Sequence, residues 1–195
     1  MKFLRKTKYY EGIVYEWNLP SGFTCPFALE CLVKVDRHTG KFDNKSKAYR
    51  CYSAMQERFP AVRNYRWSNF DYVRDGGVPL LPKKAESIRI HMSGDFYSQK
   101  YFDMWLKICK DNPTVEFWAY TKSLNYWVNR LNEIPYNLIL TASMGGKHDR
   151  LIELHGLKNV EIIKKKEQAK GRPIDTCDDQ ARKPKVNFCL LDNFA

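Results

Sequence analysis

Short apolar runs alternate with longer amphipathic stretches from Ser87 onward. The run SIRIHMSGD is short and rich in β-branched residues, and it predicts a strand over 87–95. In 98–113, apolar residues recur at helical spacing, Ser98 can cap the helix, and Pro113 ends it. The pattern predicts these further elements: strand 115–123, helix 124–134, strand 136–146, helix 148–157, strand 159–165 and strand 186–191. This alternation with short connections indicates βαβ units and a parallel sheet.

The first third of the chain has a different pattern. One strand is expected within 11–22, ending at Pro20 and Gly22, and the polar segment 37–47 predicts an exposed loop. Two consecutive helices, separated by Pro60, are expected after that loop. No linker or repeat divides the 195 residues, so residues 1–195 are expected to form a single domain. The predicted fold class is α/β, with a parallel sheet and flanking helices, as an open sheet or a partial or distorted barrel.

Hydropathy and cysteine content indicate a compartment. No run approaches the roughly 20 apolar residues of a membrane span, and the first residues lack the apolar core of a signal peptide. We therefore expect a soluble, unexported protein in a reducing cytoplasm, with no membrane partner. Clustered thiols hold metal more often than disulfides in such a compartment. The six cysteines are Cys25, Cys31, Cys51, Cys109, Cys177 and Cys189.

Three of these cysteines suggest a metal site. Cys25 and Cys31 are separated by five residues, and Cys51 follows after the predicted loop. Thiolates are soft ligands for zinc or for an iron–sulfur cluster. Zinc ribbons and fingers place their ligands in tighter pairs, so this spacing favours a larger cuboidal cluster. The alternative interpretation is three buried free thiols that pack as small apolar side chains.

The fourth ligand has several candidates. Cys177 lies in a polar segment just past a predicted strand, and its thiol can reach the same edge of the sheet. Cys189 lies in an apolar run and is a reserve candidate, whereas Cys109 falls on the apolar stripe of a helix and is expected in the core. If neither Cys177 nor Cys189 binds, one iron is open to a substrate or to S-adenosylmethionine.

Polar residues follow the predicted strands, at the edge where ligands bind in open α/β sheets. Asp95 can bind a cation, accept a hydrogen bond from the metal loop, or cap the next helix. Lys122 can neutralise a cluster, bind an anionic substrate, or remain solvated. We predict Asp95 and Lys122 as cofactor-binding residues. His91 lies within a strand and is expected to be a core histidine.

The chain is strongly basic, with 33 Lys and Arg against 22 Asp and Glu and a net charge of +11. Such an excess favours anionic partners such as nucleic acid. The basic residues are scattered along the sequence, and no recognised nucleic-acid-binding motif accompanies them. A zinc-stabilised nucleic-acid-binding protein is therefore the alternative function.

Several motifs together resemble the bacteriophage gene product 88 family. They are CPFALECLVK, RCYSAMQERFPAVRNYRWSN, SGDFYS, AYTKS and PIDTCDDQARKPKVNFCLLD, and the resemblance covers about residues 12–192. It implies an α/β barrel-like fold in the host cytoplasm, carrying a [4Fe-4S] cluster and distantly similar to radical S-adenosylmethionine enzymes. It also implies Cys25, Cys31 and Cys51 as ligands, with a redox or cluster-based catalytic role and a redox partner. The CxxxCxxC spacing of radical S-adenosylmethionine enzymes is absent, which argues against reductive cleavage of that cofactor.

Overall fold

The computed structural model describes residues 2, 4–8, 10–43 and 51–192. The end of the predicted loop 37–47 and the start of the first predicted helix lie outside the described residues. The strands are β1 (Arg5–Lys6), β2 (Val14–Trp17), β3 (Ser87–Ile90), β4 (Glu116–Thr121), β5 (Leu138–Ser143), β6 (Asn159–Ile163), β7 (Ile174–Asp175) and β8 (Phe188–Leu191). The helices are α1 (Tyr52–Gln56), α2 (Pro60–Arg74), α3 (Gln99–Asp111), α4 (Leu124–Val128) and α5 (Arg150–Leu154), with 3₁₀ turns η1 (Leu131–Glu133) and η2 (Lys166–Ala169).

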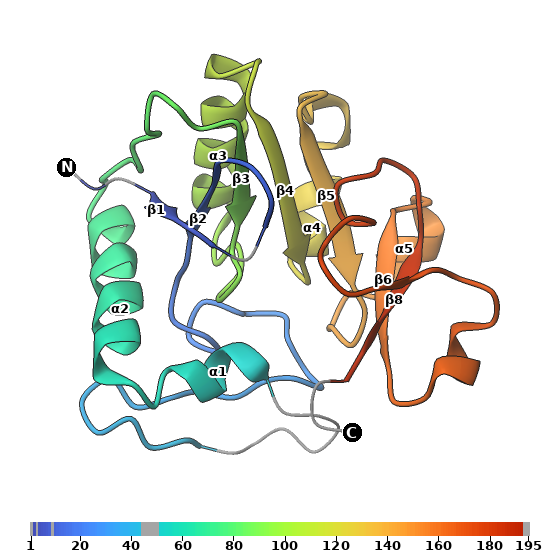
Figure 1. Cartoon of the computed structure of the whole chain (residues 1–195), viewed down its shortest axis with the longest axis horizontal. Helices are drawn as coiled ribbons and strands as arrows, with labels where there is room; N and C mark the ends of the chain where they lie inside the picture. The colour runs from blue at the N-terminus through green and yellow to red at the C-terminus, as the bar shows by residue number, and fades with distance from the viewer. Residues whose placement is uncertain (1, 3, 9, 44–50, 193–195) are drawn as a thin grey trace.

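The described strands form one sheet in the order β1-β2-β3-β4-β5-β6-β8-β7 (Figure 1). The β1–β2 pair is antiparallel, and every other neighbouring pair is parallel. The predicted α/β class with a parallel sheet and flanking helices is confirmed. The sheet stays open and does not close into a barrel, because β1 and β7 form its two edges in the described part of the chain.

Helix α3 shows how local sequence sets an element. The Ser98 hydroxyl accepts a hydrogen bond from the Tyr101 amide at 3.2 Å, which satisfies one of the free donors of the first turn. The helix buries an apolar stripe that includes Phe102, Trp105 and Cys109 against the sheet. It ends at Asp111, just before Pro113, so the prediction for this stretch is confirmed, and Cys109 is a core residue as expected.

The predicted helix 124–134 was wrong in its length. Helix α4 ends at Val128, and Arg130 leaves helical geometry with φ −130° and ψ 20° before η1 begins. The Arg130 guanidinium donates to both carboxylate oxygens of Asp103 on α3, at 3.0 and 2.9 Å. The local periodicity predicts one helix, but the helix breaks near Arg130, where this side chain contacts α3.

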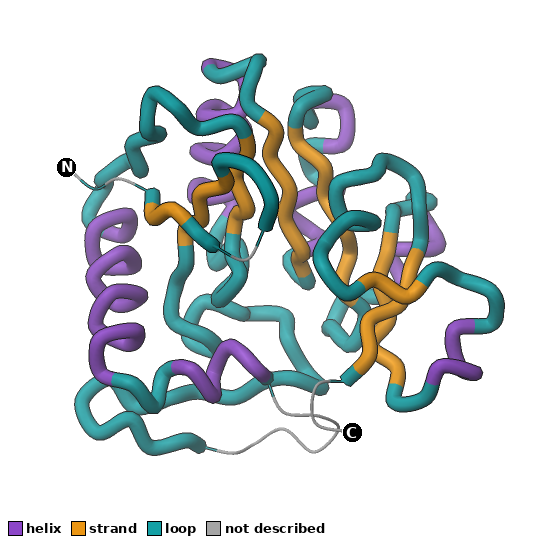
Figure 2. Tube along the Cα trace, in the orientation of Figure 1, coloured by secondary structure: helices purple, strands orange, loops and turns teal. Residues whose placement is uncertain are grey.

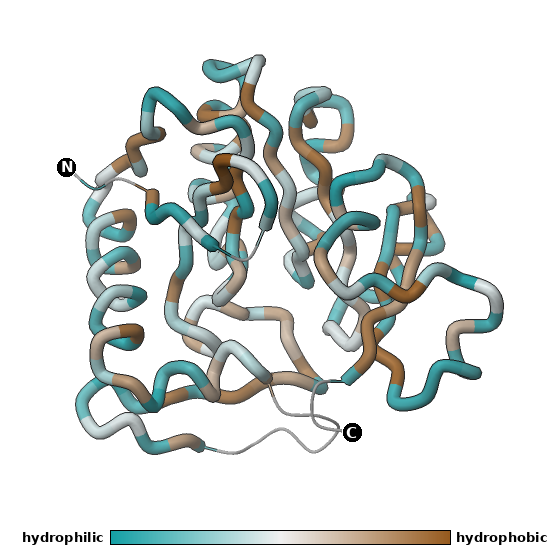
Figure 3. The backbone as a smooth tube through the Cα atoms, in the orientation of Figure 1, coloured by the Kyte–Doolittle hydropathy of each residue, from teal (hydrophilic) through white to brown (hydrophobic). Residues whose placement is uncertain are grey.

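The two faces of the sheet differ in character. The face under α3 is the main apolar core, and the strand β5, which contributes to this core, takes mostly hydrophobic colours in Figure 3. The opposite face buries Glu16, Arg89 and Thr141 beside an apolar cluster with Trp118 at its centre. None of the helices that the structure describes combines the length and apolar character of a membrane span.

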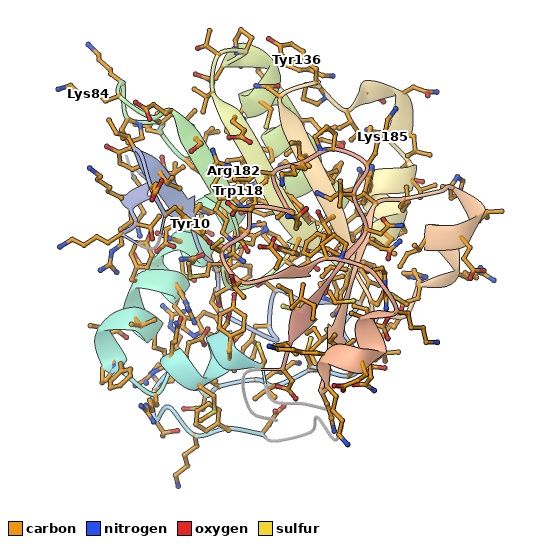
Figure 4. The ribbon with its side chains drawn as sticks, turned by 45° about the vertical axis from the view of Figure 1, so that its right-hand side comes forward. Tyr10, Lys84, Trp118, Tyr136, Arg182 and Lys185 are labelled. Atoms are coloured by element: carbon orange, nitrogen blue, oxygen red, sulfur yellow. The ribbon has the colours of Figure 1, made fainter. Side chains whose placement is uncertain are left out.

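The segment 175–187, here called the strap, covers the more polar face. Its Asp178 carboxylate accepts hydrogen bonds from the hydroxyls of Tyr10 at 2.6 Å and Tyr120 at 2.8 Å, and forms an ion pair with Arg89 at 2.9 Å. Figure 4 shows Arg182 of the strap near Trp118, and its guanidinium carbon lies 5.1 Å from the centre of that ring. One buried carboxylate thus fastens the strap to the sheet.

Candidate functional site

The carboxyl ends of β2, β3, β4 and β5 share one edge with α1 and a long loop (Figures 1 and 2). Hydrogen bonds hold the loops together at this edge. The Leu19 amide donates to the Ser93 carbonyl at 2.9 Å, and the Ser93 amide donates to the Asn18 side chain at 3.2 Å. The loops after β2 and β3 therefore form one surface, at the position where open parallel sheets bind ligands.

Cys25 lies in a turn after β2 that requires a glycine. Gly22 has φ +72°, and a Cβ built on it would lie 2.2 Å from the Val33 carbonyl oxygen. Only glycine permits both this backbone conformation and this close approach. The approach brings the chain near Val33, and with it Cys31, against the turn that carries Cys25. Cys51 immediately precedes α1 and accepts from the Met55 amide through its carbonyl.

The three thiols act on one another electrostatically. Burial raises the pKa of Cys25 well above its usual range, and the nearby Asp95, Cys31 and Cys51 raise it further. Burial and the neighbouring Cys31 raise the pKa of Cys51 to about 11. The structure thus places Cys25 and Cys31, both on the loop after β2, near Cys51 at the start of α1, with Asp95 beside Cys25. Each of these thiols would be stabilised as a thiolate by a cation at their centre.

A single metal ion requires its ligand atoms to converge on one point. No group of three or more His, Cys, Asp or Glu side chains within residues 2, 4–8, 10–43 and 51–192 is arranged to hold a metal ion. The three thiols are neighbours without the geometry of one ion's ligand set. Their grouping therefore rests on the electrostatic effect of neighbouring thiols on the pKa of Cys25 and of Cys51.

Asp95 joins the ends of β3 and β4. Its carboxylate accepts from the Thr121 hydroxyl at 2.6 Å, the Lys122 amide at 2.8 Å and the Phe96 amide at 2.7 Å. Burial raises its pKa to about 6, and these three donors oppose the shift. The cap of α3 is Ser98, so capping is not the role of Asp95. Asp95 positions the loop next to Cys25.

Lys122 joins the ends of β4 and β5. Its ammonium donates to the Ser143 carbonyl and hydroxyl, each at 3.0 Å, and to the Met144 carbonyl. The side chain is buried, so the solvated alternative is wrong. The charge of Lys122 lies beside Asp95, where it lowers the pKa of that carboxyl against the effect of burial.

The remaining candidate thiols lie in other surroundings. Cys177 is exposed on the strap, with its sulfur 3.1 Å from an Asp179 carboxylate oxygen. Cys189 is buried in a small apolar cluster with Ile163 and Ala169. The described contacts therefore group Cys25, Cys31 and Cys51 and associate Cys177 with Asp179 instead.

Glu57 is a supporting residue that the sequence analysis missed. Its fully buried carboxylate accepts from the amide and the hydroxyl of Ser21, at 2.8 and 2.9 Å, and pairs with Arg66 at 2.9 Å. It also raises the pKa of Cys51. The network fixes the start of the Cys25 loop against α1. The available signal was that Glu57 is the only acidic residue between Asp43 and Asp71 in the sequence.

The fold and site define an open, mostly parallel α/β protein with three thiols at the carboxyl edge of its sheet. The chain belongs to the gene product 88 family, whose model matches residues 2–191. It is 33% identical over 131 residues to the Gene 88 protein of Mycobacterium phage L5, and 32% identical over 122 residues to the Gene 88 protein of Mycobacterium phage D29. Each match covers 57% of this chain and 48% of the relative, so the matched region spans about half of each phage protein. No solved structure matches the chain.

Proposed function

We propose that the chain binds an iron–sulfur cluster of the [4Fe-4S] type through the thiolates of Cys25, Cys31 and Cys51. One observation carries the proposal: two thiols of the loop after β2 and one at the start of α1 lie within electrostatic range of one another at the ligand-binding edge of the sheet. Burial and the neighbouring negative groups raise the pKa of Cys25 and of Cys51, which disfavours these two thiolates without a cation. A bound metal centre removes that cost, because coordination deprotonates thiols outright.

The donor chemistry supports a cluster over a single zinc ion. Zinc holds sulfur at about 2.3 Å, which requires its thiolates to converge on one point. In a cuboidal cluster each thiolate binds a different iron, so the sulfurs stand farther apart. The five residues between Cys25 and Cys31 exceed the ligand spacing of zinc ribbons and fingers, which favours the second arrangement.

Three protein ligands leave one iron with an open position. Clusters used only for electron transfer generally have four cysteine ligands, so an open iron adds substrate binding to the possible redox role. In this proposal Asp95 and Lys122 define the surroundings of the cluster. Asp95 places a carboxylate beside Cys25, and Lys122 holds the loops after β4 and β5. An external donor group supplies the fourth ligand unless Cys177 or Cys189 does so.

The test is anaerobic purification followed by iron and sulfide analysis and visible spectroscopy. We expect Cys25→Ser, Cys31→Ser and Cys51→Ser each to lose iron and the absorption of thiolate-bound iron. Cys109→Ala is the matched control, since it removes a buried thiol from the core on α3. Loss of iron in Cys177→Ser identifies that residue as the fourth ligand. Wild-type protein that contains zinc or no metal, or three variants that keep wild-type iron, would overturn the proposal.

A further inference from the structure

Basic charge is concentrated in one part of the chain. The stretch 31–74 contains ten Lys and Arg and four Asp and Glu, so it carries +6 of the net +11 in less than a quarter of the sequence. Its described parts are the loop 31–43, α1 and α2, next to the carboxyl edge of the sheet (Figure 1). The described part of this stretch has seven basic and four acidic residues and so carries +3: Lys34, Arg37, Lys41, Arg58, Arg63, Arg66 and Arg74 against Asp36, Asp43, Glu57 and Asp71.

Two large aromatic rings are exposed in this region. Phe23 is 43% exposed and Phe59 is 52% exposed, although burial is the usual position for phenylalanine. Each ring has a cation over it: the Lys34 ammonium lies 5.2 Å from the centre of Phe23, and the Arg58 guanidinium carbon lies 4.7 Å from the centre of Phe59. We call Phe23, Lys34, Arg37, Arg58 and Phe59 the basic rim.

Trp67 contacts both Phe23 and Arg37 of the basic rim. Its ring centre lies 4.9 Å from that of Phe23, and the Arg37 guanidinium carbon lies 4.9 Å from the same indole. Trp67 itself is buried on α2, so its ring supports these two side chains from below. Phe23 and Arg37 are therefore held side by side, an aromatic ring next to a cation.

Arg63 connects the segment that carries Arg37 to the segment that carries Arg58 and Phe59. Its buried guanidinium donates to the carbonyls of Arg37 at 2.9 Å, Glu57 at 2.7 Å and Arg58 at 3.4 Å. Gly40 makes room for it, since a Cβ there would lie 2.6 Å from an Arg63 nitrogen. The loop with Arg37 and the turn with Arg58 are thus joined by one side chain, so the basic rim is a pre-organised surface.

The carboxylates of this region are largely engaged. Asp71 pairs with Arg37 at 2.6 Å, and Asp36 accepts from the backbone amides of its own turn at 3.0 and 2.7 Å. The salt bridges of the described residues include neither Lys34 nor Arg58. The positive charge of these two residues is therefore available to an anionic ligand.

We propose that the basic rim binds single-stranded nucleic acid, with bases stacked on Phe23 and Phe59 and phosphates at Lys34 and Arg58. Proteins that hold single strands without sequence preference combine basic surface with aromatic platforms. A duplex hides the faces of its bases within the stack, so it cannot use the rings. An acidic protein can use the cations but has no stacking bases. The inference does not depend on the cluster.

The experiment measures fluorescence anisotropy of a labelled oligothymidine of about 12 nucleotides, a length within the usual range for one binding site. We expect the Phe23→Leu, Phe59→Leu double variant to bind at least tenfold more weakly, because leucine keeps the apolar volume and removes the stacking face. The Lys34→Ala, Arg58→Ala double variant should lower the slope of log K against log salt by about one to two, roughly one for each lost phosphate contact.

Matched controls come from the opposite end of the molecule. Tyr136 is 84% exposed, and Tyr136→Leu removes an aromatic ring there, while Lys84→Ala removes a cation (Figure 4). Both controls should bind within twofold of wild type. Iron content is measured in every variant, so that loss of a cluster is separated from loss of a nucleic-acid contact.

Competitors identify the ligand. An abasic sugar–phosphate oligomer and polyglutamate of equal charge should each compete at least tenfold less well than oligothymidine. Equal competition by either polyanion, tighter binding of the duplex, or no binding by wild type would overturn the proposal. A loss of affinity in the two controls as large as in the rim variants would overturn it as well.

Discussion

His91 should make the stability of this protein depend on pH in a way that one substitution removes. The ring is 3% exposed at the end of β3 and packs against Phe96, Tyr101 and Trp105, with ring centres 4.8, 5.6 and 6.4 Å away. One nitrogen, Nε2, lies 2.9 Å from the Tyr101 hydroxyl, and Nδ1 has no described partner. His91 is thus a core histidine, as its sequence context predicts, with one of its two nitrogens bonded.

Burial lowers the pKa of His91 from 6.5 to about 3. The folded state therefore holds the ring neutral, while the unfolded chain binds a proton below pH 6.5. Stability is fully present above that pH and falls as the pH drops from about 6.5 towards 3. At pH 5 the unfolded imidazole is about 1.5 pH units below its pKa, and at 1.36 kcal/mol per unit the loss is about 2 kcal/mol.

The assay is urea unfolding at pH 7.5 and pH 5.0, with linear extrapolation to water. His91→Asn is the test variant, because His91 has φ +63° and asparagine tolerates that conformation. Its packing loss is the same at both pH values, so wild type should lose about 2 kcal/mol more than the variant between them.

Comparing wild type with His91→Asn also cancels the contribution of other titrating groups to the pH dependence of stability. Burial raises the pKa of Asp95 to about 6, which has the opposite sign, and this group is present in both proteins. His155→Asn, at an exposed position, is the control for removing one imidazole. If wild type and His91→Asn show the same change from pH 7.5 to 5.0, the reasoning about His91 is refuted.

Three further predictions concern stability. Arg66→Met leaves the buried Glu57 carboxylate unpaired and should cost about 3–5 kcal/mol in urea unfolding, with much of it recovered by adding Glu57→Gln; no recovery would contradict the pairing argument. Ser98→Ala removes the α3 cap and should cost about 1 kcal/mol, or about 2–4 °C in thermal unfolding, while Ser98→Asp retains stability. Asp178→Ala leaves Arg89 unpaired and should release the strap, measured as faster trypsin cleavage in 175–187 than in wild type; unchanged cleavage would contradict its anchoring role.

Elements with their own periodicity were predictable from sequence. The stretch 98–113 shows a cap, an apolar stripe and a terminating proline, and the structure has α3 at Gln99–Asp111. The two-residue strands β1 and β7 were missed, because two residues cannot display a period of two. The break at Arg130 was missed because its partner Asp103 lies on another helix.

The site was predictable only in part. Asp95 and Lys122 could be placed at the edge because residues that follow parallel strands meet there. Cys177 could not be placed, since its position depends on how the strap crosses the sheet, and Asp178 rather than Cys177 makes the contacts that fix the strap. Glu57 was missed because its partner Ser21 is 36 residues away in the sequence.

By itself, the sequence determined the α/β class, the parallel sheet and the edge at which polar residues collect. Those properties follow from hydrophobic periodicity, which is a local pattern and can be read from the sequence without knowing any tertiary contact. Only the tertiary structure decided which carboxylates lie beside the three predicted thiols and which basic residues share a surface. The close approach of Gly22 to Val33 and the bond from Arg63 to the Arg37 carbonyl join positions 11 and 26 residues apart, and such contacts depend on packing that no local pattern encodes.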